Sequence, residues 1–383
     1  MPSYWVIFVG KALMKNLTTL LLLGLALPLF SVAQTDSTQK STGKFDYTFY
    51  IDAYYSYDFN RPYDHERSEF IYQYNQHNQF SINMAVANVN YKNGNLTANL
   101  GLNAGDFPQR NMGNERDLIR YLYQANISYK FFKKWEFTVG MFPSHLGFES
   151  ALSYDNFVVS HSLASEWTPY YLAGAKIAFT PSKKWAFSFT GANAGQRVGS
   201  VPGINNKLLG LQATWTPNDK VLINYSNAYF SEQPDSLKRS IFYNNLYATF
   251  KLTKKLDLIT GIDLGIQEEP NDSTFHTVAV ATAIARYQFA KKWAVAGRFE
   301  FYNDPDNLVV PAATTGNAFV TSCSSLNLDY QPMDRLKIRL EGRYFSSEKP
   351  LFRDDTDFDP NSSTTVRYTN QDLNLLLSIQ ASF

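Results

Sequence analysis

Apolar and polar residues alternate with a period of two over most of the chain after residue 44. In residues 45–59, every odd position is aromatic or aliphatic, and most even positions are polar. Residues 371–383 repeat this alternation with Leu376 as an exception, and residues 256–266 show it again. Because side chains alternate across a β-strand, each of these segments is predicted to be a strand with one apolar face and one polar face.

The predicted strands are joined alternately by short turns and by longer polar loops. Turn-forming residues predict short turns at seven places: Asn93-Gly94, Lys133-Lys134, Ser182-Lys183, Asn218-Asp219, Thr253-Lys254, Lys291-Lys292 and Met333-Asp334. The longer loops are rich in Pro, Asn, Asp, Gly and Ser and fall near 60–78, 107–118, 144–167, 194–206, 231–239, 268–275, 304–317 and 348–368. Paired strands plus one unpaired strand at each end make about 16 strands, an even number with alternating connections, which is typical of an outer-membrane barrel.

The predicted fold is therefore an all-β, transmembrane, antiparallel up-and-down β-barrel with short periplasmic turns and longer external loops. A soluble propeller has a similar spacing of turns, so spacing alone does not separate the two folds. The strands are longer than those of a propeller, and no Gly-His or Trp-Asp signature is present. A soluble barrel of this size would leave an interior too wide for side chains to fill. These observations favour the membrane barrel.

The N-terminal region contains a predicted secretory signal peptide. Lys15 supplies a positive charge, residues 17–30 form an apolar run, and Ser31-Val32-Ala33 is a small-residue cleavage site. The run of about 14 residues is shorter than the roughly 20 that a spanning helix needs. We expect a signal peptide at 1–33 with the true start at Met14, a short periplasmic segment at 34–44 and a transmembrane barrel at 45–383. Localisation in a bacterial outer membrane follows from this export signal and the predicted barrel.

Charge and cysteine content exclude several classes of function. The chain has 35 basic and 34 acidic residues, which argues against nucleic acid as a partner. The single cysteine, Cys323, allows neither an intrachain disulfide nor a cysteine metal cluster. Residues 353–360 space their aspartates like a calcium loop, but Pro360 and Val366 stand where the EF-hand needs Gly and Glu. We expect no metal and no cofactor, although a loose external cation site stays open.

The triplet Lys-Lys-Trp occurs three times, each time at a predicted short turn. Trp135, Trp185 and Trp293 then lie on the apolar face at the start of a strand. An indole ring suits this depth because its body packs on lipid while its N–H reaches water. The triplets predict a periplasmic aromatic girdle rather than a nucleic-acid patch.

The loop after the fifth predicted strand carries a resemblance to a known family. Its pattern consists of these residues at their places: Gly140, Phe142, Gly147, Glu149, Asn156, Phe157, Ser160, Ser162, Pro169 and Gly174, with His161 where a basic residue is frequent. In this pattern the chain resembles the β-barrel porins of the OmpL-like type, common in the Bacteroidetes lineage. The resemblance implies a channel-forming outer-membrane protein without known enzymatic activity, and it leaves the solute open.

The same loop supplies candidates for a pore constriction. They are polar or charged residues between 144 and 167: His145, Glu149, Asp155, Asn156, His161 and Glu166. Fixed charges across a narrow, water-filled lumen would filter solutes by size and charge. The alternative, which stays open here, is that these side chains only hold the loop together by hydrogen bonds.

Further charges are predicted on the lumen face, because charge on the lipid face costs roughly 2–4 kcal/mol near the midplane. By strand parity they are Arg120, Arg298, Glu300, Lys337, Arg339, Glu341 and Arg343. One interpretation is a solvated, salt-bridged barrel interior, and the other is an arginine ladder that favours anionic solutes. Both stay open at this point.

The sequence thus predicts an outer-membrane porin for passive diffusion of small hydrophilic solutes, with no enzymatic step. Expected partners are outer-membrane lipid, those solutes and the outer-membrane assembly machinery, for which the terminal Phe383 resembles the recognition signal. A homotrimer is expected only by analogy with sixteen-stranded porins. The alternatives are a structural or surface-attachment barrel and a barrel-embedded lipid hydrolase. The hydrolase would need a convergent nucleophile, and Ser160, His161 and Ser162 are adjacent on extended chain, so they face apart.

Overall fold

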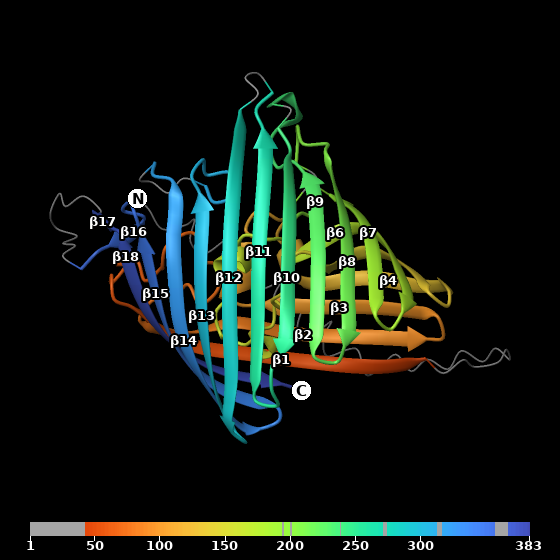
Figure 1. The fold of residues 1–383 in the computed structure, drawn as a ribbon, viewed down its shortest axis with the longest axis horizontal. Coiled ribbons are helices and arrows are strands. Elements are labelled where there is room, and N and C mark those ends of the chain that lie inside the picture. Colours follow the sequence, from red (N-terminus) through yellow and green to blue (C-terminus); the bar gives the residue numbers. More distant parts are fainter. Residues whose placement is uncertain are drawn as a thin grey trace, which may run out of the picture. The chain divides into compact units, whose positions relative to one another are not determined.

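The protein forms a closed antiparallel barrel of sixteen strands in a computed structural model. The structure describes residues 43–193, 195–199, 201–237, 239–270, 274–311, 316–356 and 367–383. Consecutive strands lie side by side around the barrel, and the last strand pairs with the first to close it (Figure 1). The predicted all-β architecture and the strand count of about 16 are confirmed.

The strands of the barrel are mostly nine to sixteen residues long, which suits crossing a bilayer at a tilt. In chain order they are β1 (Lys44–Asp58), β2 (Gln79–Asn93), β3 (Leu96–Ala104), β4 (Leu122–Phe132), β5 (Trp135–Pro143), β6 (Tyr171–Ser182), β7 (Trp185–Asn193), β8 (Lys207–Asn218), β9 (Val221–Phe230), β10 (Ile241–Lys251), β11 (Leu256–Glu268), β12 (Phe275–Ala290), β13 (Trp293–Asp304), β14 (Phe319–Met333), β15 (Leu336–Ser347) and β18 (Gln371–Ser382).

All seven predicted short turns join neighbouring strands at one end of the barrel, and the longer loops lie at the other end. The longer loops contain the few remaining elements: α2 (Asp106–Asn111), η2 (Ile119–Tyr121), η3 (Ser153–Asp155), α3 (Leu163–Glu166), η4 (Asp235–Leu237) and the small sheet of β16 (Phe352–Asp354) with β17 (Arg367–Thr369). None of the described helices is long and apolar enough to cross a membrane. The predicted signal peptide at 1–33 and most of the segment 34–44 lie outside the described residues.

The outer face of the barrel is apolar and exposed, as strand parity predicts. In β1, the odd-numbered Phe45, Phe49 and Ile51 are about half exposed. The even-numbered Asp52 points to the opposite face and is fully buried. In β18, Leu375 and Leu377 are exposed and Leu376 faces the interior. A wide apolar surface of this kind is stable against lipid rather than water.

The barrel closes between β1 and β18. The two strands pair over nine positions, from Tyr50 opposite Ser382 to Asp58 opposite Asn374. Beyond this register, the N–H of Phe383 donates to the carbonyl of Phe49 over 2.8 Å. Closure leaves no unpaired strand edge in the described barrel, which lipid requires because it cannot hydrogen-bond to backbone.

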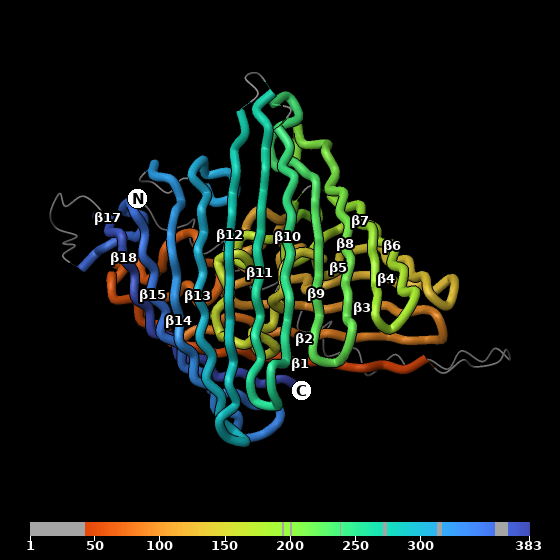
Figure 2. Tube along the Cα trace, viewed as in Figure 1, coloured from red at the N-terminus to blue at the C-terminus, as the bar shows by residue number. Residues whose placement is uncertain are grey.

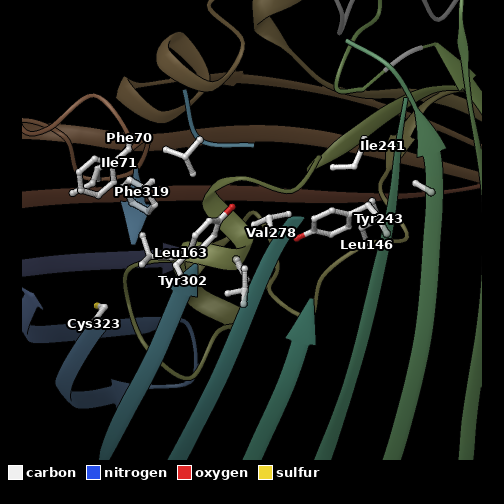
Figure 3. Close-up of a cluster of buried hydrophobic side chains, with 14 of the residues drawn as sticks. Phe70, Ile71, Leu146, Leu163, Ile241, Tyr243, Val278, Tyr302, Phe319 and Cys323 are labelled. Carbon is white, nitrogen blue, oxygen red and sulfur yellow. The ribbon is translucent and has the colours of Figure 1, made fainter. Parts of the chain in front are cut away.

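The interior is filled in part by the loop that follows β5. We name residues 144–170 the inward loop, and Figure 2 shows its yellow trace within the ring of strands. Its Leu163 and Leu146 belong to one buried apolar cluster with wall residues such as Tyr302 and Tyr243. Figure 3 shows Leu163 beside Tyr302 and Leu146 beside Tyr243. This packing fixes the loop inside the barrel, since buried apolar contact is the main stabilising term available to a loop.

Candidate functional site

The inward loop crosses the barrel and forms hydrogen bonds with walls far from its own strands. Near its start, the imidazole Nε2 of His145 donates to the carbonyl of Asn227 on β9 over 2.9 Å. Further along, the N–H of Val159 donates to Asn327 on β14 over 3.2 Å. The loop therefore reaches across the lumen, and its Tyr154 also donates to the carbonyl of Asp334 at a short turn. The candidate site is the space between this loop and the surrounding strands.

The strongest attachment is to β13, β14 and β15, which we name the anchoring wall. The guanidinium of Arg339 is fully buried and donates from Nε to Asp329 over 2.7 Å. Its terminal nitrogens donate to the loop carbonyls of Ser153 (2.6 Å), Asn156 (3.0 Å) and Phe157 (3.1 Å). A buried guanidinium is stable only when its charge is paired and its donors are satisfied, and the loop backbone completes that set.

A second group of charges on the anchoring wall holds the middle of the inward loop. Arg298 lies 2.9 Å from Glu300 and 3.0 Å from Glu341, and Arg343 lies 3.1 Å from Glu300. The carboxylate of Glu341 accepts from both the N–H and the hydroxyl of Ser160, each over 2.9 Å. Glu300 also accepts from the N–H of Leu163 at the start of α3. The wall thus binds the loop through paired charges that are at most 3% exposed.

Most of the predicted constriction residues are engaged within the loop rather than turned toward water. His145, Asn156, His161 and Glu166 are buried, and Asn156 forms two 2.8 Å hydrogen bonds with Ser150. Glu149 is partly exposed, and its Oε2 accepts from the N–H and the hydroxyl of Ser162, each over 2.7 Å. Asp155 alone among the six is exposed. These contacts are the ones expected if the side chains shape the loop.

Burial changes the protonation of two loop residues. It lowers the pKa of His161 to about 3, although a hydrogen bond with the carbonyl of Ser150 acts in the opposite direction. It raises the pKa of Glu166 to about 8, with the nearby Arg343 acting in the opposite direction. Desolvation disfavours the charged form of each group. At neutral pH, His161 is uncharged and Glu166 is largely protonated.

Six of the seven predicted lumen charges lie on the inner face of the barrel, and Arg120 lies in a loop. Lys337, Arg339, Glu341 and Arg343 contact the inward loop or its neighbours from β15, and so face the interior. Arg298 and Glu300 do so from β13. Arg120 lies in η2, before β4 begins, and donates to the carbonyl of Glu115 over 2.9 Å. Its predicted place on a strand is wrong. The alternation of apolar residues that marks β4 begins already in η2, before the strand itself begins.

Of the two interpretations of the lumen charges, the salt-bridged interior agrees with the ion pairs at the anchoring wall, but these pairs are buried rather than solvated. Arg298, Arg339 and Arg343 are buried beneath the inward loop, and each has a carboxylate partner. A ladder of free guanidinium groups along the open lumen is therefore not what these residues form. Their charge is neutralised locally, within a hydrogen-bonded contact between wall and loop.

Several residues of the site were not singled out by the sequence. Asp329 pairs with Arg339. It lies two residues after the buried Asn327 on the same strand, so strand parity would have placed it on the inner face. Asp52 of β1 accepts hydrogen bonds from Tyr74 and Ser378, over 2.6 and 2.7 Å. Gln73 contacts His161 over 2.9 Å. Tyr74 and Gln73 belong to the loop after β1, and nothing in their local sequence predicts contacts inside the barrel.

The three tryptophans of the Lys-Lys-Trp triplets lie at the short-turn end on the outer face. Trp185 and Trp293 are 41% and 38% exposed. Each lies on the same face of its strand as further exposed aromatic residues. Each triplet tryptophan stacks on a neighbouring strand's ring: Trp135 on Phe179 at 4.4 Å, Trp185 on Trp215 at 5.8 Å and Trp293 on Tyr330 at 4.5 Å between centroids. A belt of paired aromatic rings at this level is typical of a membrane interface.

A closed sixteen-stranded barrel with an apolar outer face and an internal loop is typical of an outer-membrane channel. The family profile described as "Putative beta-barrel porin-2, OmpL-like" matches residues 44–378, nearly the whole described barrel. The chain belongs to this porin family. The resemblance seen in the sequence is thereby confirmed, and the porin is an outer-membrane channel.

Solved structures of other porins share this fold at low sequence identity. The porin matches Salmonella typhi OmpF in complex with daunomycin with a TM-score of 0.60 and 11% identity, over 90% of this chain and 99% of that one. It matches an anion-selective porin from Comamonas acidovorans with a TM-score of 0.58 and 9% identity, over 89% of this chain and 100% of that one. It matches the outer-membrane channel DcaP of Acinetobacter baumannii with a TM-score of 0.57 and 9% identity, over 91% of this chain and 100% of that one. At such identity the likeness concerns the fold alone. No curated protein matches the chain.

Proposed function

We propose that this porin is a passive diffusion channel for small hydrophilic solutes and that it performs no covalent chemistry. The observation that carries the proposal is the inward loop, which narrows a barrel otherwise wide enough for a water-filled lumen. A loop bonded both to β9 and to the anchoring wall sets an upper size for the solutes that pass.

Liposome swelling tests this proposal directly. Vesicles containing the purified porin are placed in isotonic solutions of sugars of increasing size, and the swelling rate is followed by light scattering. We expect rates that fall steadily with solute size and reach the protein-free rate for large oligosaccharides. Swelling no faster than in protein-free vesicles for every sugar would contradict the proposal and favour a structural or surface-attachment barrel.

The proposal extends to the six candidate constriction residues. His145, Glu149, Asp155, Asn156, His161 and Glu166 all belong to the inward loop, and we propose that they act on permeation mainly by keeping this loop in shape. Asn156 forms its bonds within the loop, whereas His145 bonds the wall at Asn227. Loss of such a contact is expected to alter the size cut-off in the swelling assay rather than abolish permeation.

We also propose that the porin is exported with cleavage after Ala33 and inserted by the outer-membrane assembly machinery through its C-terminal strand. Phe383 is 55% exposed on the outer face and pairs with Phe49 through its backbone. Phe383→Ala should lower the amount of folded porin in outer-membrane fractions, with the N-terminal sequence of the mature chain measured in the same samples. An unchanged amount would remove this role for Phe383.

A homotrimer is part of the same proposal. One of the fold relatives, OmpT of Vibrio cholerae, is described in a trimer form. Native mass spectrometry of the porin in detergent should show three copies, and a single copy would contradict the trimer without affecting the diffusion channel.

A further inference from the structure

The two sides of the lumen differ in how far water can reach them. On the anchoring wall and β18, the inward side chains of Arg298, Asn327, Arg339, Glu341 and Ser378 are at most 3% exposed. Opposite them, strands β3–β8, which we name the open wall, carry partly exposed inward side chains: Thr97, Asn99, Gln124, Lys176, Ser188 and Gln212. The inward loop therefore covers the anchoring wall more fully than the open wall. On the open wall Asn126, Thr138 and Thr190 are also buried, and Gln212 donates to the carbonyl of His145.

A cavity of about 150 Å³ lies where the inward loop faces β2–β5. Met84, Asn103, Leu122 and Met141 line it from the barrel, and Glu149 is among its loop residues. The cavity shares Met112 and Tyr171 with a larger cavity of about 460 Å³ among the long loops. The two cavities therefore adjoin each other, on the side of the open wall.

We propose that solutes pass between the inward loop and strands β3–β5, and that the carboxylate of Glu149 makes this passage favour cations and uncharged solutes over anions. The inference rests on the proposed diffusion function and deepens it. The route excludes the anchoring wall, where loop and strands are in direct contact.

Glu149 is the charged side chain of the narrow cavity among the described residues. One carboxylate oxygen, Oε2, accepts from Ser162, while Oε1 is buried and has no hydrogen-bond partner. A carboxylate in the lining of a narrow passage attracts cations and repels anions. The arginines that would oppose it lie behind the loop and are paired with carboxylates, and Lys176 of β6 is not part of the cavity lining.

Charges in the outer cavities act in the same direction. The carboxylates that line the two cavities of about 460 and 520 Å³, apart from the largely protonated Glu166, are Asp58, Asp64, Glu66, Glu69, Glu115 and Glu232. The basic side chains lining them are Arg67, Arg110, Arg197 and Arg353. The linings of these two cavities therefore carry an excess of negative charge, which raises the local concentration of cations.

The reversal potential in a KCl gradient tests the charge preference. We expect wild-type channels in a planar bilayer to favour K⁺ over Cl⁻, and Glu149→Gln to lower the permeability ratio by about twofold or more. Asp219→Asn, an exposed residue of a short turn, is the matched control and should leave the ratio unchanged. Anion preference in the wild type, or an unchanged ratio in Glu149→Gln, would overturn the inference. Absence of any channel would instead contradict the proposed function.

Cysteine modification tests the route. Leu122→Cys lines the narrow cavity, whereas Ser325→Cys lies on the inner face of the anchoring wall and is 8% exposed. A trimethylammonium methanethiosulfonate reagent should reduce the current through Leu122→Cys by about half or more. The same reagent should leave the current through Ser325→Cys unchanged. The current through the wild type should also stay the same, because Cys323 is 1% exposed.

Ser150→Cys lines the same cavity from the loop side and serves where Leu122→Cys does not fold. Its current should fall in the same way. Block of Ser325→Cys alone, or of none of the cavity variants, would overturn the proposed route.

Discussion

The two sides of the barrel interior use different polar side chains. The anchoring wall carries Arg, Glu and Asp, and these side chains are buried against the inward loop. The open wall carries mainly Asn, Gln, Ser and Thr, several of which are partly exposed. Inward-facing charge in this porin thus serves to hold a loop, while the aqueous side is largely neutral.

The energetics of buried charge explain the difference. A guanidinium taken out of water costs several kcal/mol unless carboxylates and hydrogen-bond acceptors replace the water. Arg339 receives two oxygens from Asp329 and three carbonyls from the loop. The same bonds that stabilise the arginine specify one position for the loop. For selectivity, the accessible charges count and the total number of charges in the lumen does not.

The largest effect is expected from Arg339→Met. The change leaves the buried Asp329 with only Asn327 and the more distant Arg286, and it frees three loop carbonyls, at a cost of about 3–5 kcal/mol. We expect the loop to leave the wall and single-channel conductance to rise and fluctuate. The matched control is Arg335→Met, in the exposed turn just before the same strand. Unchanged conductance in a correctly folded Arg339→Met barrel would show that the arginine does not hold the loop.

A double variant sharpens this result. Replacing Asp329 by Leu together with Arg339→Met removes both buried charges, so the combined loss of stability should be smaller than the sum of the two single losses. Urea unfolding midpoints of the four proteins measure it. Simple additivity would mean that the two groups do not interact.

The second effect concerns pH. Burial raises the pKa of Glu166 to about 8, from an ordinary value near 4.5. The folded loop therefore holds a proton that the unfolded chain releases, so stability falls as pH rises from about 4.5 to about 8 and changes no further above that. Between pH 7.5 and 8.5, where His161 is largely neutral in both states, Glu166→Gln should flatten the dependence of the unfolding midpoint on pH. The same slope in both proteins would contradict the assignment.

A smaller effect is expected at the outer girdle, which touches neither wall of the lumen. Trp185→Ala removes the ring stacked on Trp215 and should lower the free energy of unfolding by about 1 kcal/mol. Conductance should stay the same, since the change is on the lipid side. Lys183→Ala in the adjacent turn is the control and should change neither the free energy of unfolding nor the conductance. Altered conductance in Trp185→Ala would argue against the outward placement.

The smallest effect is expected on the open wall. Gln124 donates to Asn88 over 2.8 Å and makes no hydrogen bond to the inward loop. Gln124→Ala should cost less than about 1 kcal/mol and raise conductance slightly by widening the route. A loss as large as that of Arg339→Met would remove the distinction between the two walls.

Strand parity and turn chemistry predicted the barrel well because both are local. The alternation in residues 45–59 and the seven short turns predicted sixteen strands with the correct inner and outer faces. Parity also placed Arg339 and Glu300 on the inner face. It failed at Arg120, where alternation runs past the end of a strand into η2.

The role of the inner charges could not be predicted, because it depends on contacts between distant parts of the chain. Arg339 bonds Ser153, a residue 186 positions away, and Gln73 contacts His161 across 88 positions. Sequence alone leaves open whether a guanidinium meets water or a loop carbonyl. Only the position of the inward loop decides between a solvated ladder and a buried anchor.

Hydrogen–deuterium exchange of the inward loop tests the central claim most directly. The N–H groups of Val159, Ser160 and Leu163 donate to side chains of the anchoring wall. In the porin embedded in liposomes, residues 158–163 should therefore exchange as slowly as the strand amides of β14. Exchange as fast as that of the exposed loop 231–237 would contradict an inward loop fixed to the anchoring wall.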